Sequence, residues 1–121
     1  MRLIDTNILI DYFNGSLPEK YLVLIEHSFI SSMTLAELAD KFQRENMCFE
    51  EVKDFLKENF TILNIGFEIA ILAAKIKKER RKKFNKFGLS DALILATAKT
   101  NNLILYTKDK DFSGEAEVLN Y

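Results

Sequence analysis

One carboxylate interrupts the apolar run Leu3-Ile4-Asp5-Thr6-Asn7-Ile8-Leu9-Ile10 near the start of the chain. The residues before Asp5 are typical of a buried strand, and Thr6-Asn7 indicates the turn into a helix. In an open α/β sheet, ligand chemistry gathers at the carboxyl ends of the strands, where Asp5 would lie. Asp5 could equally be the N-cap of a helix that begins near Ile8. From this stretch alone, both interpretations stay open.

Strand-like apolar runs recur along the rest of the chain and alternate with helical segments. The runs cover residues 2–4, 28–31, 61–65, 103–106 and 116–119. Apolar spacing predicts amphipathic helices after Thr34, over residues 49–56 and from Phe67 to about Lys83, and a buried helix over residues 91–98. This β-α order predicts an α/β fold in which helices cover both faces of a parallel sheet.

The composition predicts a single folded domain over residues 1–121. Hydrophobic residues make up 48% of the chain, enough for a core, and the net charge is −1. The apolar stretches are broken well short of the roughly 18 residues that a membrane span needs, so we expect no span. Cys48 and His27 are the only residues of their types, which excludes an internal disulfide and a zinc site built on Cys and His. We therefore expect a cytoplasmic protein, with His27 on the surface before a strand.

Three more acids lie in or beside apolar segments, as Asp5 does. Glu37 lies in Leu35-Ala36-Glu37-Leu38-Ala39, Asp91 in Leu89-Ser90-Asp91-Ala92-Leu93-Ile94-Leu95, and Asp109 beyond the strand-like run 103–106. Burying a carboxylate is costly unless a cation or hydrogen bonds replace the lost water. Four such acids at strand ends, or in the helix turns beside them, indicate an oxygen-ligand site for a hard cation such as Mg²⁺ or Mn²⁺.

Structural roles compete with this interpretation at each acid. Thr34-Leu35-Ala36-Glu37 has the pattern of a capping box, and its acid could also pair with Lys41 one turn on. Asp91 follows Ser90, a good N-cap, and an acid in the first turn suits the helix dipole. However, Asp91 lies on the inward-facing stripe of its predicted helix, where it needs a partner. The fourth acid could simply belong to a turn.

Four motifs carry these acids in a fixed order. They are Ile4-Asp5-Thr6-Asn7, Thr34-Leu35-Ala36-Glu37-Leu38, Leu89-Ser90-Asp91-Ala92-Leu93-Ile94-Leu95-Ala96 and Tyr106-Thr107-Lys108-Asp109-Lys110-Asp111-Phe112. In order, spacing and coverage of the chain, they closely resemble the PIN-domain ribonucleases, above all the VapC-type toxins of VapBC toxin–antitoxin pairs. The resemblance implies a three-layer α/β/α fold around a parallel sheet of about five strands.

The resemblance also implies an activity and assigns a site. The activity is Mg²⁺- or Mn²⁺-dependent endonucleolytic cleavage of RNA by a homodimer that a small antitoxin protein holds inactive. The residues on the family's catalytic and metal-binding positions are Asp5, Glu37, Asp91 and Asp109, with Asn7 and Thr107 lining the site and Asp111 as a further acid beside it. Asp5 and Asp91 would hold the principal ion, and the other two acids would complete its site or hold a second ion.

A basic block lies between Lys75 and Phe87, where eight Lys or Arg residues accompany one acid. Such a block is either a solvated helix end or a stripe that binds a polyanion. Within it, Lys78, Arg81 and Lys82 are the candidates for contacts with RNA phosphates or with an acidic part of an antitoxin.

The predicted helix from Phe67 is apolar on two sides, so it must meet something besides the sheet. Its second stripe consists of Ile69, Leu72, Ala73 and Ile76. This stripe, or the predicted helix over residues 49–56, is the candidate surface of a homodimer.

The motifs do not fit two other functional classes. A haloacid-dehalogenase-like phosphatase needs a second aspartate where this chain has Asn7, and a receiver domain needs an aspartate after the third strand, where residues 60–65 contain none. Two alternatives stay open. One is a PIN-domain nuclease that processes RNA and has no antitoxin, and the other is a non-catalytic module that binds RNA or protein.

Overall fold

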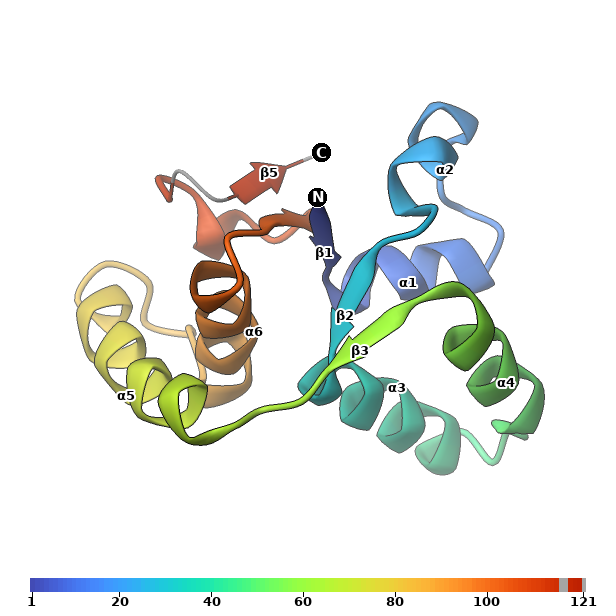
Figure 1. Ribbon diagram of the computed structural model, residues 1–121, viewed down its shortest axis with the longest axis horizontal. Helices are drawn as coiled ribbons and strands as arrows, with labels where there is room; N and C mark the ends of the chain where they lie inside the picture. Colours follow the sequence, from blue (N-terminus) through green and yellow to red (C-terminus); the bar gives the residue numbers. More distant parts are fainter. Residues whose placement is uncertain (116–117, 121) are drawn as a thin grey trace.

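A computed structural model describes residues 1–115 and 118–120 of the chain. Within them, five strands form one sheet in the order β3-β2-β1-β4-β5, and every neighbouring pair is parallel (Figure 1). The strands are β1 (Arg2–Ile4), β2 (Phe29–Ser31), β3 (Thr61–Leu63), β4 (Ile104–Thr107) and β5 (Val118–Asn120). The predicted parallel α/β sheet is confirmed. Part of the last predicted strand, residues 116 and 117, lies outside the described residues.

Helices cover both faces of this sheet and make three layers (Figure 1). They are α1 (Thr6–Phe13), α2 (Glu19–Ile25), α3 (Ser32–Arg44), α4 (Glu50–Asn59), α5 (Phe67–Arg81), α6 (Leu89–Thr100) and the short 3₁₀ helix η1 (Lys110–Phe112). α5 and α6 lie on one side, and α1 to α4 lie on the other. α2, which begins after Pro18, was not predicted from the sequence. None of the described helices combines the length and apolar character that crossing a bilayer requires.

Alternate residues of the central strands belong to different layers. Leu3 and Leu105 pack with α5 and α6, whereas Ile4 and Tyr106 pack with the helices of the other face. All four side chains are 0% exposed. This is the pattern of strands covered on both faces, in which successive side chains point to opposite sides.

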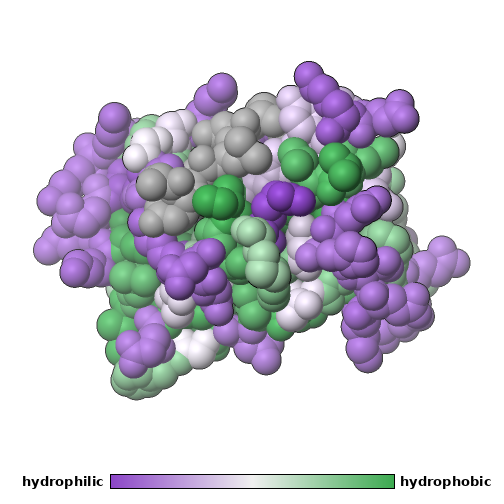
Figure 2. Space-filling view, turned by 45° about the horizontal axis from the view of Figure 1, so that its top comes forward, coloured by the Kyte–Doolittle hydropathy of each residue, from purple (hydrophilic) through white to green (hydrophobic). Residues whose placement is uncertain are grey.

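The two apolar stripes of α5 have the opposite roles to those predicted. The layer shared with α6 buries Ile69, Ala73 and Ile76, so the prediction that this stripe forms the dimer surface was wrong. On the other side, Phe67 is 77% and Ile71 is 59% exposed. Figure 2 shows that hydrophobic surface also stays uncovered between projecting hydrophilic side chains on one face of the molecule.

The strand order fixes where ligand chemistry is expected. β1 has β2 on one side and β4 on the other, so the chain reverses its direction of travel across the sheet at this strand. Beyond the carboxyl ends of strands at such a switch point, the connecting segments diverge and leave a crevice. Asp5 follows β1 at this position, and Thr107 ends the neighbouring strand β4.

Candidate active site

Asp5 is 5% exposed and lies between the ends of β1 and β4. Its Oδ1 accepts a hydrogen bond from the backbone N–H of Thr6 (2.7 Å). Its Oδ2 accepts from the hydroxyl of Thr107 (2.6 Å) and from Nδ2 of Asn7 (3.1 Å). Asp5 is also the N-cap of α1, so the capping interpretation is confirmed, and this role leaves a role in a site open.

Burial makes the charged form of Asp5 unfavourable. It raises the pKa of the Asp5 carboxyl from 3.8 to about 7, and the negative charges of Glu37 and Asp91 add to this rise. The hydrogen bonds from Thr107 and Thr6 oppose it. Near neutral pH the Asp5 carboxyl is therefore only partly ionised, and either a proton or a cation can neutralise it.

The capping box predicted at Thr34 and Glu37 is wrong. α3 begins earlier than expected, with Ser31 as its N-cap, and the Ser31 hydroxyl accepts from the backbone N–H of the second helical residue (3.0 Å). The predicted ion pair of Glu37 with Lys41 is also replaced, because Lys41 pairs with Glu45 at 2.7 Å. Glu37 is thus not held by the helix end, which removes its main structural alternative.

Glu37 instead contacts the segment that follows β1. Its Oε1 accepts a 2.6 Å hydrogen bond from the hydroxyl of Thr6, which lies 3.3 Å from the hydroxyl of buried Thr34. Partial burial raises the pKa of the Glu37 carboxyl, and the charge of Asp91 raises it further. Neither hydroxyl was predicted from the sequence to belong to the site. The signal for Thr6 was its place between Asp5 and Asn7.

Asp91 lies in the first turn of α6 and is half-buried. The N-cap of this helix is Gly88 and not Ser90 as predicted, and the backbone N–H of Gly88 donates to Oδ2 of Asp91 (2.9 Å). Burial raises the pKa of the Asp91 carboxyl, and the charges of Asp109 and Asp111 raise it further. Asp91 therefore helps to cap its helix and also faces the acids of another segment.

The segment after β4 carries two of the predicted acids in a defined turn. The hydroxyl of Thr107 accepts from the N–H of Asp109 (3.0 Å), and Oδ1 of Asp109 accepts from the N–H of Asp111 (2.9 Å). Beside it, the ammonium group of Lys108 pairs with Asp11 of α1 at 2.6 Å. This ion pair ties the turn to α1. No local pattern predicts this ion pair, because 97 residues separate the partners.

A family model described as PIN domain matches residues 2–117 of the chain. The chain belongs to the PIN domain family. This confirms the resemblance drawn from the four motifs. Solved structures agree: the PIN domain is similar, at 31% identity and a TM-score of 0.80, to a chain of a toxin-antitoxin complex from Klebsiella pneumoniae, with 99% of this chain and 97% of that chain covered. VapBC2 from Rickettsia felis, bound to a promoter DNA fragment, shares the fold at 23% identity with a TM-score of 0.79, over 99% and 98% of the two chains.

Named relatives also match the PIN domain over most of its length. It is 34% identical over 126 residues to the ribonuclease VapC of Rickettsia bellii, which covers 97% of this chain and 93% of the relative. It is 32% identical over 108 residues to the ribonuclease VapC1 of Methanocaldococcus jannaschii, with 89% and 75% of the two chains covered.

The acids of this PIN domain suit a hard cation by their chemistry. Carboxylate and hydroxyl oxygens are the donors that Mg²⁺ and Mn²⁺ prefer, and positive charge would offset the burial and the mutual repulsion that raise the pKa of Asp5, Glu37 and Asp91. Among the described residues, however, no three His, Cys, Asp or Glu side chains form a ready-made ligand set. Both oxygens of Asp5 already accept hydrogen bonds. For these acids to coordinate one ion together, some of their side chains would therefore have to rotate.

The basic block of this PIN domain divides between surface and interior. Lys78 and Lys82 are exposed. Arg81 is exposed too, but its Nε donates to the backbone carbonyl of Phe87. The side chain of Arg80, by contrast, is only 11% exposed. The block is thus neither wholly a solvated helix end nor wholly a binding stripe.

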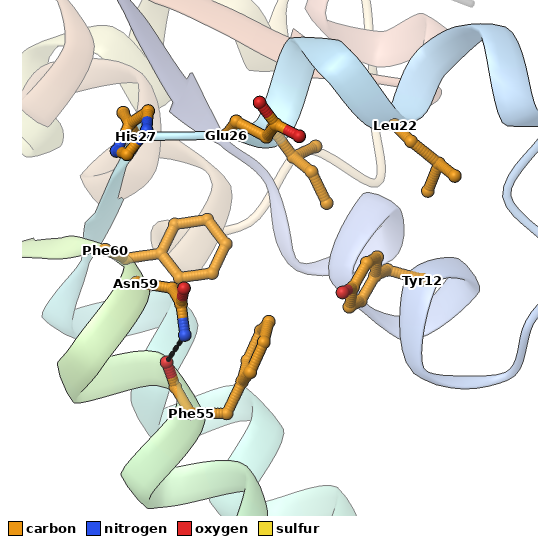
Figure 3. Close-up of a pocket in the computed structure, with 8 residues that line it drawn as sticks. Tyr12, Leu22, Glu26, His27, Phe55, Asn59 and Phe60 are labelled. Atoms are coloured by element: carbon orange, nitrogen blue, oxygen red, sulfur yellow. Dashed lines mark hydrogen bonds between the residues drawn. The ribbon is translucent and has the colours of Figure 1, made fainter.

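A separate hollow of about 480 Å³ lies between α1, α2 and α4 (Figure 3). Tyr12, Leu22, Phe55 and Phe60 surround it, and the rings of Tyr12 and Phe55 are stacked at 5.7 Å. Exposed His27 lines it just before β2, as predicted for a surface residue. None of the predicted site residues lines this hollow, so the acids form a different site.

Proposed function

We propose that this PIN domain is a metal-dependent endoribonuclease that acts as the toxin of a toxin–antitoxin pair. The observation that carries the proposal is that hydrogen bonds join buried Asp5 to acids of other segments. Thr107 donates to Asp5 and accepts from the N–H of Asp109, and Thr6 donates to Asp5 and to Glu37. The charge of Asp91 adds to the rise in the pKa of Asp5. The relatives named ribonuclease VapC support the RNA substrate. The likeness to a chain of the Klebsiella complex supports an antitoxin partner. With Cys48 as its only cysteine, the protein suits a reducing cytoplasm.

The residues have separable tasks in this proposal. Asp5, Glu37, Asp91 and Asp109 would hold Mg²⁺ or Mn²⁺, which when bound supplies positive charge against the phosphodiester and lowers the pKa of water. The hydroxyl of Thr107 and the amide of Asn7 orient the Asp5 carboxylate, and the hydroxyl of Thr6 orients Glu37. Because the pKa of Asp5 is raised to about 7, cation binding displaces a proton from the site near neutral pH.

A cleavage assay with mapped ends tests this function. Purified protein is incubated with a mixture of RNAs in chelator or in Mn²⁺, and the new 5′ and 3′ ends are located by sequencing. We expect internal cuts in Mn²⁺ and none in chelator. Cutting that persists in chelator would contradict the metal assignment, and intact RNA in both buffers would favour a binding module. A gene for a small DNA-binding protein just upstream would distinguish a toxin from an unpaired nuclease.

We further propose that the protein is a homodimer through the exposed stripe of α5. Phe67 and Ile71 leave apolar surface that a second copy can bury. Light scattering at tens of micromolar is expected to give a dimer mass for the wild type and a monomer mass for Ile71→Glu. The matched control is Val23→Glu, since Val23 is 62% exposed on α2, and it should stay dimeric. A monomeric wild type would rule the dimer out.

The exposed part of the basic block is proposed to bind RNA phosphates. Each phosphate contact to single-stranded RNA contributes about 0.7 to the slope of log affinity against log salt. The double variant Lys78→Ala, Lys82→Ala should therefore reduce the magnitude of that negative slope by roughly 1.4. Arg81 is left in place because it also holds the carbonyl of Phe87. The control is Lys57→Ala, an exposed lysine on α4. A slope equal to that of wild type would make the block a plain solvated helix end.

A further inference from the structure

Arg80 points into the protein from the last turn of α5. Its guanidinium lies over two aromatic rings, 4.6 Å from the ring centre of Phe84 and 5.5 Å from that of Phe87. Only 11% of its side chain is exposed. Burying a cation is costly unless it is paired and hydrogen-bonded, so the contacts of this head group must compensate.

The polar contacts of this head group all go to residues 111–115, in and just after the turn that begins at Asp109. Nη2 of Arg80 donates to the backbone carbonyls of Asp111 and Ser113, the second at 2.9 Å. Nη1 forms an ion pair with Glu115 at 3.2 Å. The planar fork of a guanidinium can satisfy several acceptors at once, which a lysine ammonium at the end of a flexible stem cannot do as well.

The same segment is fixed at two other points. Phe112 is 0% exposed and packs edge-on against Phe87 at 5.4 Å. On the β4 side, the hydroxyl of Thr107 holds the N–H of Asp109. Arg80 thus closes a clamp around the turn that carries Asp109 and Asp111.

We propose that Arg80 is a positioning residue for the acidic site, which holds Asp109 and Asp111 where they face Asp91. The inference rests on the proposed function, because it assumes that these acids serve a divalent cation. It removes Arg80 from the surface that would bind RNA. It also means that Arg80, one member of the basic block, helps to shape the acidic site, whereas neighbouring members of the block face solvent.

The test is Mn²⁺ binding by RNA-free protein, measured by calorimetry. Residues that orient metal ligands typically change affinity by about 10- to 100-fold when replaced. We expect Arg80→Lys to weaken Mn²⁺ binding by about 10-fold and to speed amide exchange at residues 111–113. Excess Mn²⁺ should restore its RNA cleavage without changing KM for RNA. Two controls should bind Mn²⁺ as wild type does: Lys57→Met, an exposed lysine of α4, and Lys99→Met, which removes the other ion pair of Glu115 (2.9 Å).

The outcomes separate this inference from the function on which it rests. If wild type binds no Mn²⁺, the proposed function falls and the inference falls with it. If wild type binds Mn²⁺ but Arg80→Lys binds equally well, or only melts at a lower temperature, the inference alone is overturned. An equal loss in Lys99→Met would also overturn it, because that variant leaves the contacts of Arg80 intact and the loss would then not depend on them. Should Arg80→Lys fail to fold, Glu115→Gln weakens the same clamp from its far side. Its Mn²⁺ affinity is expected to fall, and an unchanged affinity would again overturn the inference.

Discussion

Asp5→Asn is expected to abolish RNA cleavage and to change how the stability of the metal-free protein depends on pH. The substitution keeps the size of the side chain but removes a ligand charge that no neighbouring group replaces. Cleavage in Mn²⁺ should fall below detection. Robust cleavage by a correctly folded Asp5→Asn protein would remove Asp5 from the catalytic site.

The stability effect follows from the raised pKa of Asp5. The pKa rises from 3.8 to about 7 on folding, so between these pH values the folded protein binds a proton that the unfolded chain releases. The free energy of unfolding therefore falls as pH rises, by about 4 kcal/mol in total, and the loss is complete only above pH 7. Asn carries no such titration, but it gives up a hydrogen bond from Thr107 or Asn7, at a cost of about 1–3 kcal/mol.

The two stability curves should consequently cross. In chelator, Asp5→Asn is expected to be less stable than wild type at pH 4 and more stable at pH 8, measured by urea unfolding at each pH. Asp40→Asn is the control, because the Asp40 side chain is 68% exposed and its loss should shift the curve little at either pH. Parallel curves for Asp5→Asn and wild type would mean that Asp5 does not titrate as described.

Mn²⁺ is expected to raise the melting temperature of wild type, and more at pH 8 than at pH 6. A ligand at 100 times its dissociation constant stabilises the folded state by about 2.7 kcal/mol, which is roughly 10 °C for a domain of this size. The rise is smaller at pH 6 because Asp5 then keeps its proton, which the cation must displace. Differential scanning fluorimetry in Mn²⁺ and in chelator measures both values.

Asp91→Asn provides the matched variant for this measurement. The amide oxygen of Asn can still accept from the N–H of Gly88, and the loss of charge relieves repulsion from Asp109 and Asp111. In chelator the variant should therefore melt no lower than wild type, whereas the rise in Mn²⁺ should disappear. A wild type that ignores millimolar Mn²⁺, together with a strongly destabilised Asp91→Asn, would mean that the acids are helix caps and not one site.

The sheet could be predicted because its strands are apolar runs set between helical segments. The residues at which the helices begin could not be predicted. The segment at the end of β2 offers three hydroxyl residues as caps, Ser31, Ser32 and Thr34. Local pattern favoured Thr34 because an acid follows it three residues on. The folded protein uses Ser31 because β2 ends there, and this is decided by pairing with β3. α2 was missed because seven residues carry too few apolar positions to show a helical period.

Long-range contacts limited the prediction of the site in the same way. Asp5 and Thr107 are 102 residues apart, and only the family resemblance placed them together before the fold was known. Arg80 shows the complementary limit, because a charge run gives no sign of which side chain turns inward. The rings of Phe84 and Phe87 close to it in the sequence were the available signal.

The two apolar layers share the central strands of the sheet, among them β1, and this determines how the protein unfolds. Leu3 anchors one layer and Ile4 the other, both with no exposed surface. Neither layer can unfold without removing packing contacts of the other layer, so partial unfolding on one side exposes apolar surface on both. Local openings of this kind approach the cost of global unfolding. The molecule should therefore unfold in one cooperative step. The backbone amides of β1 should be among the slowest to exchange, and Asp5 lies directly at the end of this strand.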